Sequence, residues 1–154
     1  MEAAMGTTLS RIIIHIVFST KDREPLITDE LRAQLFAYIG GIVKNEGAVP
    51  IIVGGMPDHV HVELGLKPAS CLSDLVKRMK ASSSKWVNEQ RRGPFRFSWQ
   101  RGYGAFSVSE SNSRKVYEYI KKQAEHHRHM SFKEELLELV RRHGIRFDEQ
   151  YLWS

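Results

Sequence analysis

The chain has 154 residues, which suits one domain with a substantial core and leaves little room for a second. Its hydrophobic content of 42% and charged content of 27% are ordinary for a globular protein, and no apolar run approaches the roughly 20 residues of a membrane helix. Its single cysteine, Cys71, excludes an intrachain disulfide and a metal site built from cysteines. With no signal-like start, we expect a cytoplasmic protein without a membrane partner.

The formal net charge of +5 is concentrated in one segment. Residues 77–101 contain eight basic residues and one acidic residue, whereas the rest of the chain carries a slight excess of acidic residues. Seven of these basic residues form a predicted phosphate-binding surface: Lys77, Arg78, Lys80, Lys85, Arg91, Arg92 and Arg101. Aromatic residues interleaved with them can stack on unpaired bases, although a solvated helix beside core aromatics has the same composition.

The first third of the sequence predicts a strand followed by a helix. After a loose leader at residues 1–10, the β-branched run at 11–19 is typical of a buried strand. Thr28 is a favourable helix N-cap, and Gly47 suits the end of the same helix. Apolar residues at helical spacing between them predict one buried helix face.

The middle of the sequence predicts two strands and a long basic helix. Residues 49–53 and 58–66 have strand character, and Gly-Gly-Met-Pro at 54–57 predicts the turn between them. A helix that begins near Ser70 buries apolar residues at helical spacing, displays much of the basic surface and ends at Gly93-Pro94.

The last third predicts a strand at about 103–109, a helix at about 112–127 and a final helix at 132–143, capped by Ser131 and closed by Gly144. The order β-α-β-β-α-β followed by helices predicts an α+β, ferredoxin-like split β-α-β fold. This fold has one antiparallel four-stranded sheet with helices on one face, plus C-terminal helices here. It hosts many activities and does not decide the function.

The third predicted strand carries a candidate metal site. His59, His61 and Glu63 alternate with apolar residues, so their side chains share one face of the strand. Two neutral imidazoles so placed can share a cation, although paired histidines on strands are commonly ordinary polar-face residues. Asp58 is placed to orient a ligand histidine, and Glu63 is a candidate ligand, general base or solvated carboxylate.

The predicted helix at 112–127 adds a tyrosine and an amide. Tyr119 and Gln123 are four residues apart and therefore share a helical face. A glutamine carbonyl oxygen can complete a His-His-Gln ligand set, although such a pair alone is usually plain helix surface. Tyr117 competes as nucleophile, but 3.6 residues per turn point it about 160° away from Tyr119.

Three further histidines, His126, His127 and His129, follow near the end of this helix. They are a candidate second metal site. Because charged histidines are also favoured by the dipole at a helix C-terminus, we prefer that simpler interpretation.

Several blocks of sequence resemble the HUH-type single-tyrosine transposases of small bacterial and archaeal insertion sequences, of which REP-associated tyrosine transposases are relatives. The main blocks are PDHVHV at 57–62, WQRGYGAFSVS at 99–109 and YIKKQAEHHR at 119–128. Weaker likeness at 15–21 and 80–83 extends the resemblance over roughly residues 11–152, although Ala81 stands where glycine is more usual. We therefore expect residues 11–154 to form a single transposase domain.

The resemblance implies a DNA transposase that binds single-stranded hairpin DNA at insertion-sequence ends. It implies cleavage and rejoining of strands through a 5′-phosphotyrosine intermediate, with Tyr119 as nucleophile. His59, His61 and Gln123 become ligands of one divalent cation, Mg²⁺ or Mn²⁺, and imidazole ligands suit manganese at least as well as magnesium. The resemblance also implies a homodimer, in which the tyrosine helix can serve either its own subunit or the other.

The sequence defines less clearly how Tyr119 is activated and which surface contacts DNA. A phenol with a pKa of about 10 is protonated at neutral pH, so Tyr119 needs help, for which Lys122 and Glu63 are candidates. The basic second helix and the loop containing Phe95, Phe97 and Trp99 are the expected DNA surface, although Trp99 itself is the better candidate for a core residue.

Two alternatives remain open. Histidine-triad nucleotide hydrolases also alternate histidines on a strand, but they require a third histidine where Glu63 stands, and they have no use for Tyr119 and Gln123. A non-catalytic or domesticated nucleic-acid-binding module of the same fold is the other alternative. The presence of all four key residues argues against a decayed site.

Overall fold

The computed structural model describes residues 8–91 and 94–148. Most of the expected leader, at residues 1–7, lies outside the described residues, as do Arg92 of the predicted phosphate-binding surface, Gly93 of the predicted helix break, and residues 149–154. Among the described helices, none combines the length and the apolar character needed to cross a lipid bilayer.

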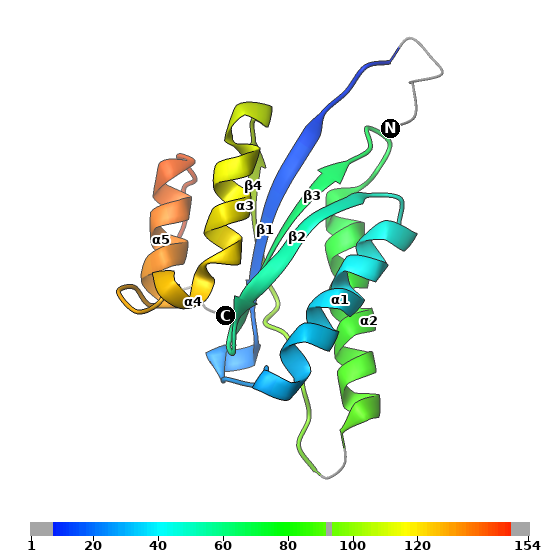
Figure 1. Ribbon diagram of the computed structural model, residues 1–154, viewed down its shortest axis with the longest axis vertical. Helices are drawn as coiled ribbons and strands as arrows, with labels where there is room; N and C mark the ends of the chain where they lie inside the picture. Colours follow the sequence, from blue (N-terminus) through cyan, green and yellow to red (C-terminus); the bar gives the residue numbers. More distant parts are fainter. Residues whose placement is uncertain (1–7, 92–93, 149–154) are drawn as a thin grey trace.

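A four-stranded antiparallel sheet forms the centre of the molecule (Figure 1). Its strands are β1 (Ile12–Ser19), β2 (Val49–Met56), β3 (His59–Leu66) and β4 (Gly104–Val108), and their order across the sheet is β2-β3-β1-β4. The central strand β1 pairs with both β3 and β4. This order and pairing confirm the predicted ferredoxin-like arrangement.

Helices cover both faces of the sheet (Figure 1). On one face lie α1 (Asp29–Asn45) and α2 (Leu72–Gln90). On the other face lie the C-terminal helices α3 (Ser113–Lys121), α4 (Gln123–His126) and α5 (Phe132–Arg142). Short 3-10 turns at Lys21–Arg23 and Glu110–Asn112 complete the described secondary structure.

The alternation along β3 explains the two layers. Val60, Val62 and Leu64 are fully buried in the larger hydrophobic cluster, which includes the inner faces of α1 and α2. The residues between them point to the opposite face, where the C-terminal helices cover them. A smaller cluster on that face joins Val17 of β1 and Phe106 of β4 to α5.

The first helix forms as predicted. The Thr28 side chain accepts a hydrogen bond from the backbone N–H of Leu31 at 3.3 Å, which caps α1. Leu35, Ile39 and Val43 then bury one stripe of the helix completely. Each such side chain contributes about 1.5–3 kcal/mol to stability, so α1 is anchored by packing rather than by its intrinsic helix propensity.

The turn predicted at residues 54–57 is displaced: β2 continues through both glycines to Met56, which pairs with His59, and the turn itself consists of Pro57 and Asp58. The physical reason is the close approach of α3. A Cβ atom on Gly54 would lie 2.8 Å from both the carbonyl oxygen and Cγ2 of Ile120. The glycine therefore belongs to the strand and lets α3 cross directly over β2.

The single helix predicted over residues 112–127 is also wrong in one detail. The backbone departs from helical geometry at Lys122, with φ −100° and ψ 27°, and separates α3 from α4. Gln123 follows at once and is buried. Its amide contacts the side chains of His59, His127 and Glu135.

The close approach at Gly54 generates a stability prediction. Gly54→Ala should lower the free energy of unfolding by about 1–3 kcal/mol, because the new methyl group overlaps the α3 backbone. Gly65→Ala in β3 is the matched control, since its Cβ would meet Val49 Cβ at an ordinary 3.7 Å. Urea denaturation measures both. Equal stability of the two variants would show that α3 does not press on β2.

Candidate functional site

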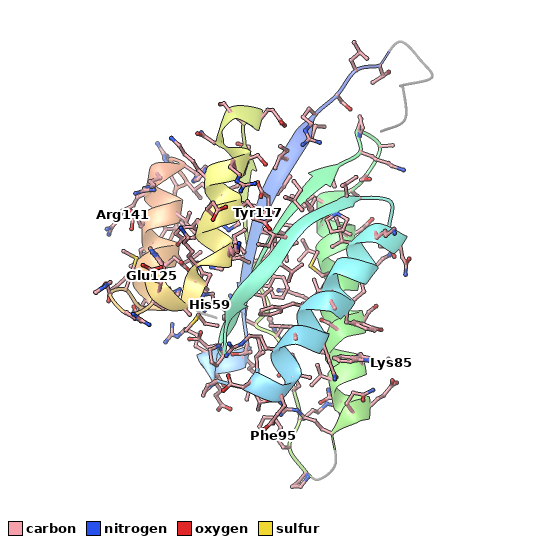
Figure 2. The ribbon with its side chains drawn as sticks, viewed as in Figure 1. His59, Lys85, Phe95, Tyr117, Glu125 and Arg141 are labelled. Carbon is pink, nitrogen blue, oxygen red and sulfur yellow. The ribbon has the colours of Figure 1, made fainter. Side chains whose placement is uncertain are left out.

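The polar face of β3 is the floor of the candidate site. His59 and His61 are both 0% exposed, because α3, α4 and α5 lie across them. Figure 2 shows His59 on the side of the sheet that faces α4. The register that places Ser19 opposite His59 and Val17 opposite His61 fixes both histidines on this face.

The two ring nitrogens of His59 have different partners. Its Nδ1 lies 2.7 Å from a carboxylate oxygen of Asp58, and its Nε2 lies 3.0 Å from Oε1 of Gln123. A carboxylate only accepts, so Nδ1 carries a proton, and Nε2 faces the carbonyl oxygen of Gln123. Asp58 thus holds the ring in the orientation that a metal ligand needs.

His61 is held by a histidine that the sequence analysis did not single out. Its Nδ1 lies 2.8 Å from Nε2 of His15 in β1, and its Nε2 lies 2.9 Å from Oε1 of Glu135 in α5. Burial, and then the proximity of His61, lower the pKa of His15 to about 3. His15 is therefore neutral at physiological pH and acts as a hydrogen-bond partner rather than as a charge.

Tyr119 reaches the same cluster from α3. Its hydroxyl donates to Oε2 of Glu135 and lies 3.1 Å from Nε2 of His126. Burial, and then the negative charge of Glu135, raise the pKa of Tyr119 above its ordinary value. The phenol is consequently protonated in this state, with an acceptor already in contact with its proton.

The carboxylate of Glu135 lies at the centre of the cluster, only 1% exposed. Besides His61 and Tyr119 it contacts Nε2 of Gln123 at 3.2 Å and Nε2 of His127 at 3.3 Å. Burial alone would raise the pKa of Glu135, but hydrogen bonds from His127 and His61 outweigh it and hold that pKa below its usual range. The group is therefore an anion inside the protein.

The sequence analysis missed Glu135, although a signal for it exists. Phe132, Leu136 and Val140 form the buried stripe of α5, and Glu135 stands within this stripe at helical spacing. A carboxylate on the buried face of an amphipathic helix needs a partner of opposite charge or a metal ion.

His127 also belongs to the cluster. Its Nε2 lies 3.0 Å from Oε1 of Gln123, and its Nδ1 donates to the carbonyl oxygen of Met130 at 2.6 Å. Although burial lowers its pKa, contact with Glu135 raises it more. The interpretation of this histidine as a helix-dipole residue is therefore wrong, whereas His129 is exposed.

One point inside the cluster meets the requirements of a cation site. Ligand atoms of His59, His61, His127 and Glu135 all lie within 4.8 Å of one another. Imidazole nitrogens with a carboxylate form a common ligand set for divalent transition metals. The carbonyl oxygen of Gln123 faces the same point, since it lies 3.0 Å from Nε2 of both His59 and His127.

Other predicted residues lie apart from this point. Glu63 is buried, but it accepts a hydrogen bond from the hydroxyl of Ser113 at 3.0 Å, and burial raises its pKa. Lys122 is exposed, with Nζ 4.0 Å from Glu118. The competing Tyr117 has the guanidinium of Arg114 over its ring at 5.3 Å.

The predicted phosphate-binding surface lies mainly on α2, across the sheet from the cluster. Lys77 and Lys85 are exposed there, and Figure 2 shows Lys85 and His59 on opposite sides of the sheet. The remaining described members have local roles as well. Arg78 pairs with Glu46 at 2.7 Å, and Arg91 donates to a backbone carbonyl at 2.6 Å.

Lys80 has a mainly structural position in that surface. Its ammonium donates to the backbone carbonyls of Gln100, Arg101 and Gly102 at 2.6–3.2 Å, and burial lowers its pKa to about 8. Arg101 itself is exposed.

The loop before β4 differs from expectation in one residue. Phe97 is 1% exposed, so its predicted DNA contact is wrong: the ring completes the core. Trp99 packs edge-on against Phe18 and Phe97, as expected of a core residue. Phe95 remains exposed at the start of the loop.

A cavity of about 550 Å³ opens beside Tyr119, between β4, α3 and α5. Its wall includes Lys115 of α3 and Arg142 of α5, together with the carboxylates of Glu135 and Glu138. Tyr119 and Glu135 both line this cavity.

Comparison with known proteins identifies one family. The family model described as "Transposase IS200 like" matches residues 8–123. The ISDra2 transposase TnpA of Deinococcus radiodurans is 27% identical over 116 residues, which cover 71% of this chain and 81% of that protein. The transposase for insertion sequence element IS200 of Salmonella typhimurium is 28% identical over 130 residues, covering 80% and 84%.

Solved structures are similar as well. A crystal structure described as that of a Deinococcus radiodurans transposase matches with a TM-score of 0.64 and 25% identity, covering 80% of this chain and 98% of that one. A REP-associated tyrosine transposase bound to a REP hairpin matches with a TM-score of 0.59, covering 82% and 74%; at 14% identity it supports the fold alone. Because the family match spans most of the chain, including Tyr119 and Gln123, the chain belongs to the IS200-like transposase family.

Proposed function

We propose that this transposase is a metal-dependent single-strand DNA endonuclease and strand transferase that uses Tyr119 as its nucleophile. One observation carries the proposal. The Tyr119 hydroxyl and the side chains of His59, His61 and Gln123 converge on one buried cluster, although they come from distant parts of the sequence.

The substrate is single-stranded DNA that folds into hairpins at the ends of an insertion sequence. Support comes from the REP-associated relative, which is bound to a REP hairpin. In this chain the exposed lysines of α2 offer a basic surface for hairpin phosphates. The cavity beside Tyr119 then receives the strand that is cut.

The reaction is a transesterification. The Tyr119 oxygen attacks phosphorus, the bond between phosphorus and the 3′ oxygen breaks, and the products are a 5′-phosphotyrosine and a 3′-OH. The phenolic proton leaves through Glu135 or His126, which are in contact with the hydroxyl, and the departing 3′ oxygen gains a proton. One phosphodiester replaces another, so a strand can be resealed without ATP.

His59, His61 and Gln123 would hold one divalent cation, Mg²⁺ or Mn²⁺. When bound, this ion supplies Lewis-acid polarisation of the scissile phosphate and stabilises the departing oxygen. The chain's own residues prepare the site, because Asp58 and His15 fix the two imidazole rings from behind.

A single chain supplies every proposed catalytic side chain. Tyr119 contacts Glu135, which in turn contacts His61, without help from another subunit. We therefore infer that each subunit of the proposed homodimer can cleave with its own tyrosine.

Tyr119→Phe should abolish the covalent protein–DNA adduct while leaving DNA binding close to normal, because only the attacking oxygen is lost. The measurement is a denaturing gel of protein incubated with labelled hairpin DNA and Mn²⁺. Tyr117→Phe is the matched control and should keep the adduct. An adduct that survives in Tyr119→Phe would reassign the nucleophile.

His59→Ala should lower the rate of strand cleavage by at least about 100-fold, since it removes a proposed metal ligand and leaves Asp58 without its partner. His129→Ala, on the exposed loop before α5, is the control. Nicking of hairpin DNA is followed with and without EDTA. Unchanged metal-dependent nicking by His59→Ala would refute the ligand assignment.

Variants of the basic α2 surface and of the basic residues that line the cavity should affect different steps, hairpin binding and cleavage respectively. Replacing Lys77, Arg78 and Lys85 by glutamine should make the salt dependence of hairpin binding shallower, by about 0.7–0.9 in the log–log slope per lost phosphate contact. Replacing Lys115 and Arg142 should instead slow adduct formation, because they line the cavity at Tyr119. An unchanged slope in the α2 variant would place the hairpin elsewhere.

A further inference from the structure

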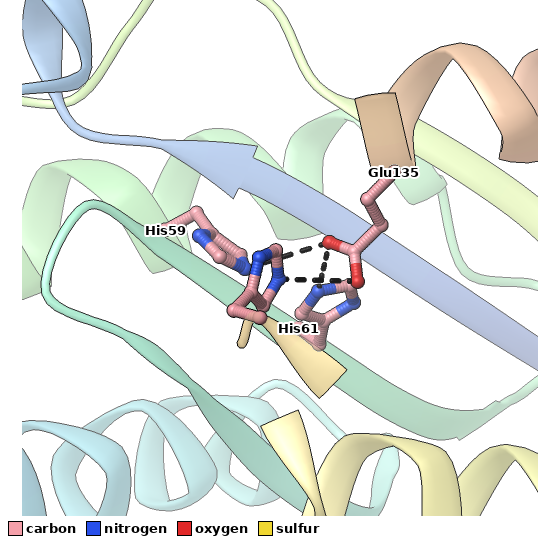
Figure 3. A group of neighbouring side chains, drawn as sticks. His59, His61 and Glu135 are labelled. Atoms are coloured by element: carbon pink, nitrogen blue, oxygen red, sulfur yellow. Dashed lines mark hydrogen bonds and ion pairs between the residues drawn. The ribbon is translucent and has the colours of Figure 1, made fainter. Parts of the chain in front are cut away.

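Helix α5 adds to the cluster a carboxylate that lies beyond the part of the chain matched by the family model, which ends at residue 123. Figure 3 shows Glu135 reaching from its helix toward His59 and His61 on β3. His127, which precedes this helix, also lies beyond the matched part. Neither residue is therefore explained by the His-His-Gln pattern of the family.

The spacing of these atoms suits a shared cation. Oε1 of Glu135 lies 2.9 Å from Nε2 of His61 and 3.5 Å from Nε2 of His59, and Oε2 lies 3.3 Å from Nε2 of His127. Ligands about 2.1 Å from one metal ion in tetrahedral arrangement are about 3.4 Å from one another. The side chains would need little movement to close on an ion.

The hydrogen bonds to the Nδ1 atom of each imidazole also support a shared cation site. Nδ1 of His59 faces a carboxylate, Nδ1 of His127 faces the carbonyl of Met130, and Nδ1 of His61 faces His15. The first two partners only accept, so those Nδ1 atoms carry protons, and the Nε2 atoms of the same two rings face the centre. Metal-binding histidines are commonly held in this way.

The centre also has an excess of acceptors. The Gln123 amide donates from Nε2 to Glu135, which turns its carbonyl oxygen toward His59 and His127. With neutral rings, that oxygen and two nitrogen lone pairs would face one another beside a carboxylate. Only positive charge, from extra protons or from a metal ion, makes this arrangement favourable.

We propose that Glu135 and His127 are direct ligands of the cation bound by His59, His61 and Gln123, so that a third imidazole and one carboxylate join that set. The inference deepens the proposed function and rests on its cation site. This ligand set favours Mn²⁺, Co²⁺ or Zn²⁺ over Mg²⁺, because imidazole suits transition metals and magnesium prefers oxygen ligands and water.

Metal binding by the DNA-free full chain tests the proposal. Isothermal titration calorimetry with Mn²⁺ should show affinity losses of at least about 100-fold for Glu135→Gln and His127→Ala, beyond the 10–100-fold expected when only an outer partner of a ligand is lost. Mg²⁺ should bind the unaltered protein far more weakly than Mn²⁺. Bound Co²⁺ should change its visible absorption in both variants.

The controls are Glu134→Gln, which keeps the capping hydrogen bond to Ser131 at the start of α5, and the exposed His129→Ala; both should bind Mn²⁺ normally. Glu135→Leu keeps the apolar packing of α5 if Glu135→Gln fails to fold, and thermal unfolding without metal checks both. Unchanged Mn²⁺ affinity in a folded Glu135 variant, or equal affinity for Mg²⁺, would overturn the proposal.

The metal-binding test of the ligand set can fail independently of the adduct test of the proposed function. Glu135-dependent Mn²⁺ binding in a protein that forms no DNA adduct would support the ligand set and refute the strand transferase. Adduct formation by the unaltered protein, together with normal Mn²⁺ binding by Glu135→Gln, would support the strand transferase and refute the ligand set.

Discussion

The buried negative charge of Glu135 constrains how the C-terminal helices lie over the sheet. A carboxylate removed from water is tolerated only when donors or cations surround it. Glu135 meets this condition with His61 from β3, Tyr119 from α3 and His127 from the segment before α5. If α5 moved, that charge would lose its partners, so the interaction that assembles the site also fixes the helical layer over the sheet.

Strand β3 serves the fold and the site at once. Its apolar residues complete the core under α1 and α2, while His59 and His61 between them form the floor of the cluster. A shift of one residue in its pairing with β1 would bury the histidines in the core and expose the valines to the cluster. The hydrophobic effect that fixes the register therefore also positions the proposed metal ligands.

The predictable and unpredictable parts of the site differ in sequence separation. The strand alternation that presents His59 and His61, and the four-residue spacing of Tyr119 and Gln123, are local patterns. Glu135 and His15 matter because of contacts across the fold, 74 and 46 residues from His61. The strand geometry of Gly54 likewise depends on a helix that passes over it, and the break at Lys122 accompanies the burial of Gln123.

The sheet separates the basic surface of α2 from Tyr119, yet the two sides are joined by a short series of hydrogen bonds. Lys80 of α2 donates to the carbonyl of Gln100 at 2.9 Å, and the Gln100 side chain accepts from the backbone N–H of Ser19 at 2.8 Å. Ser19 pairs with His59 across the sheet. The proposed hairpin, if held on α2, would therefore have a defined position relative to the proposed cation site.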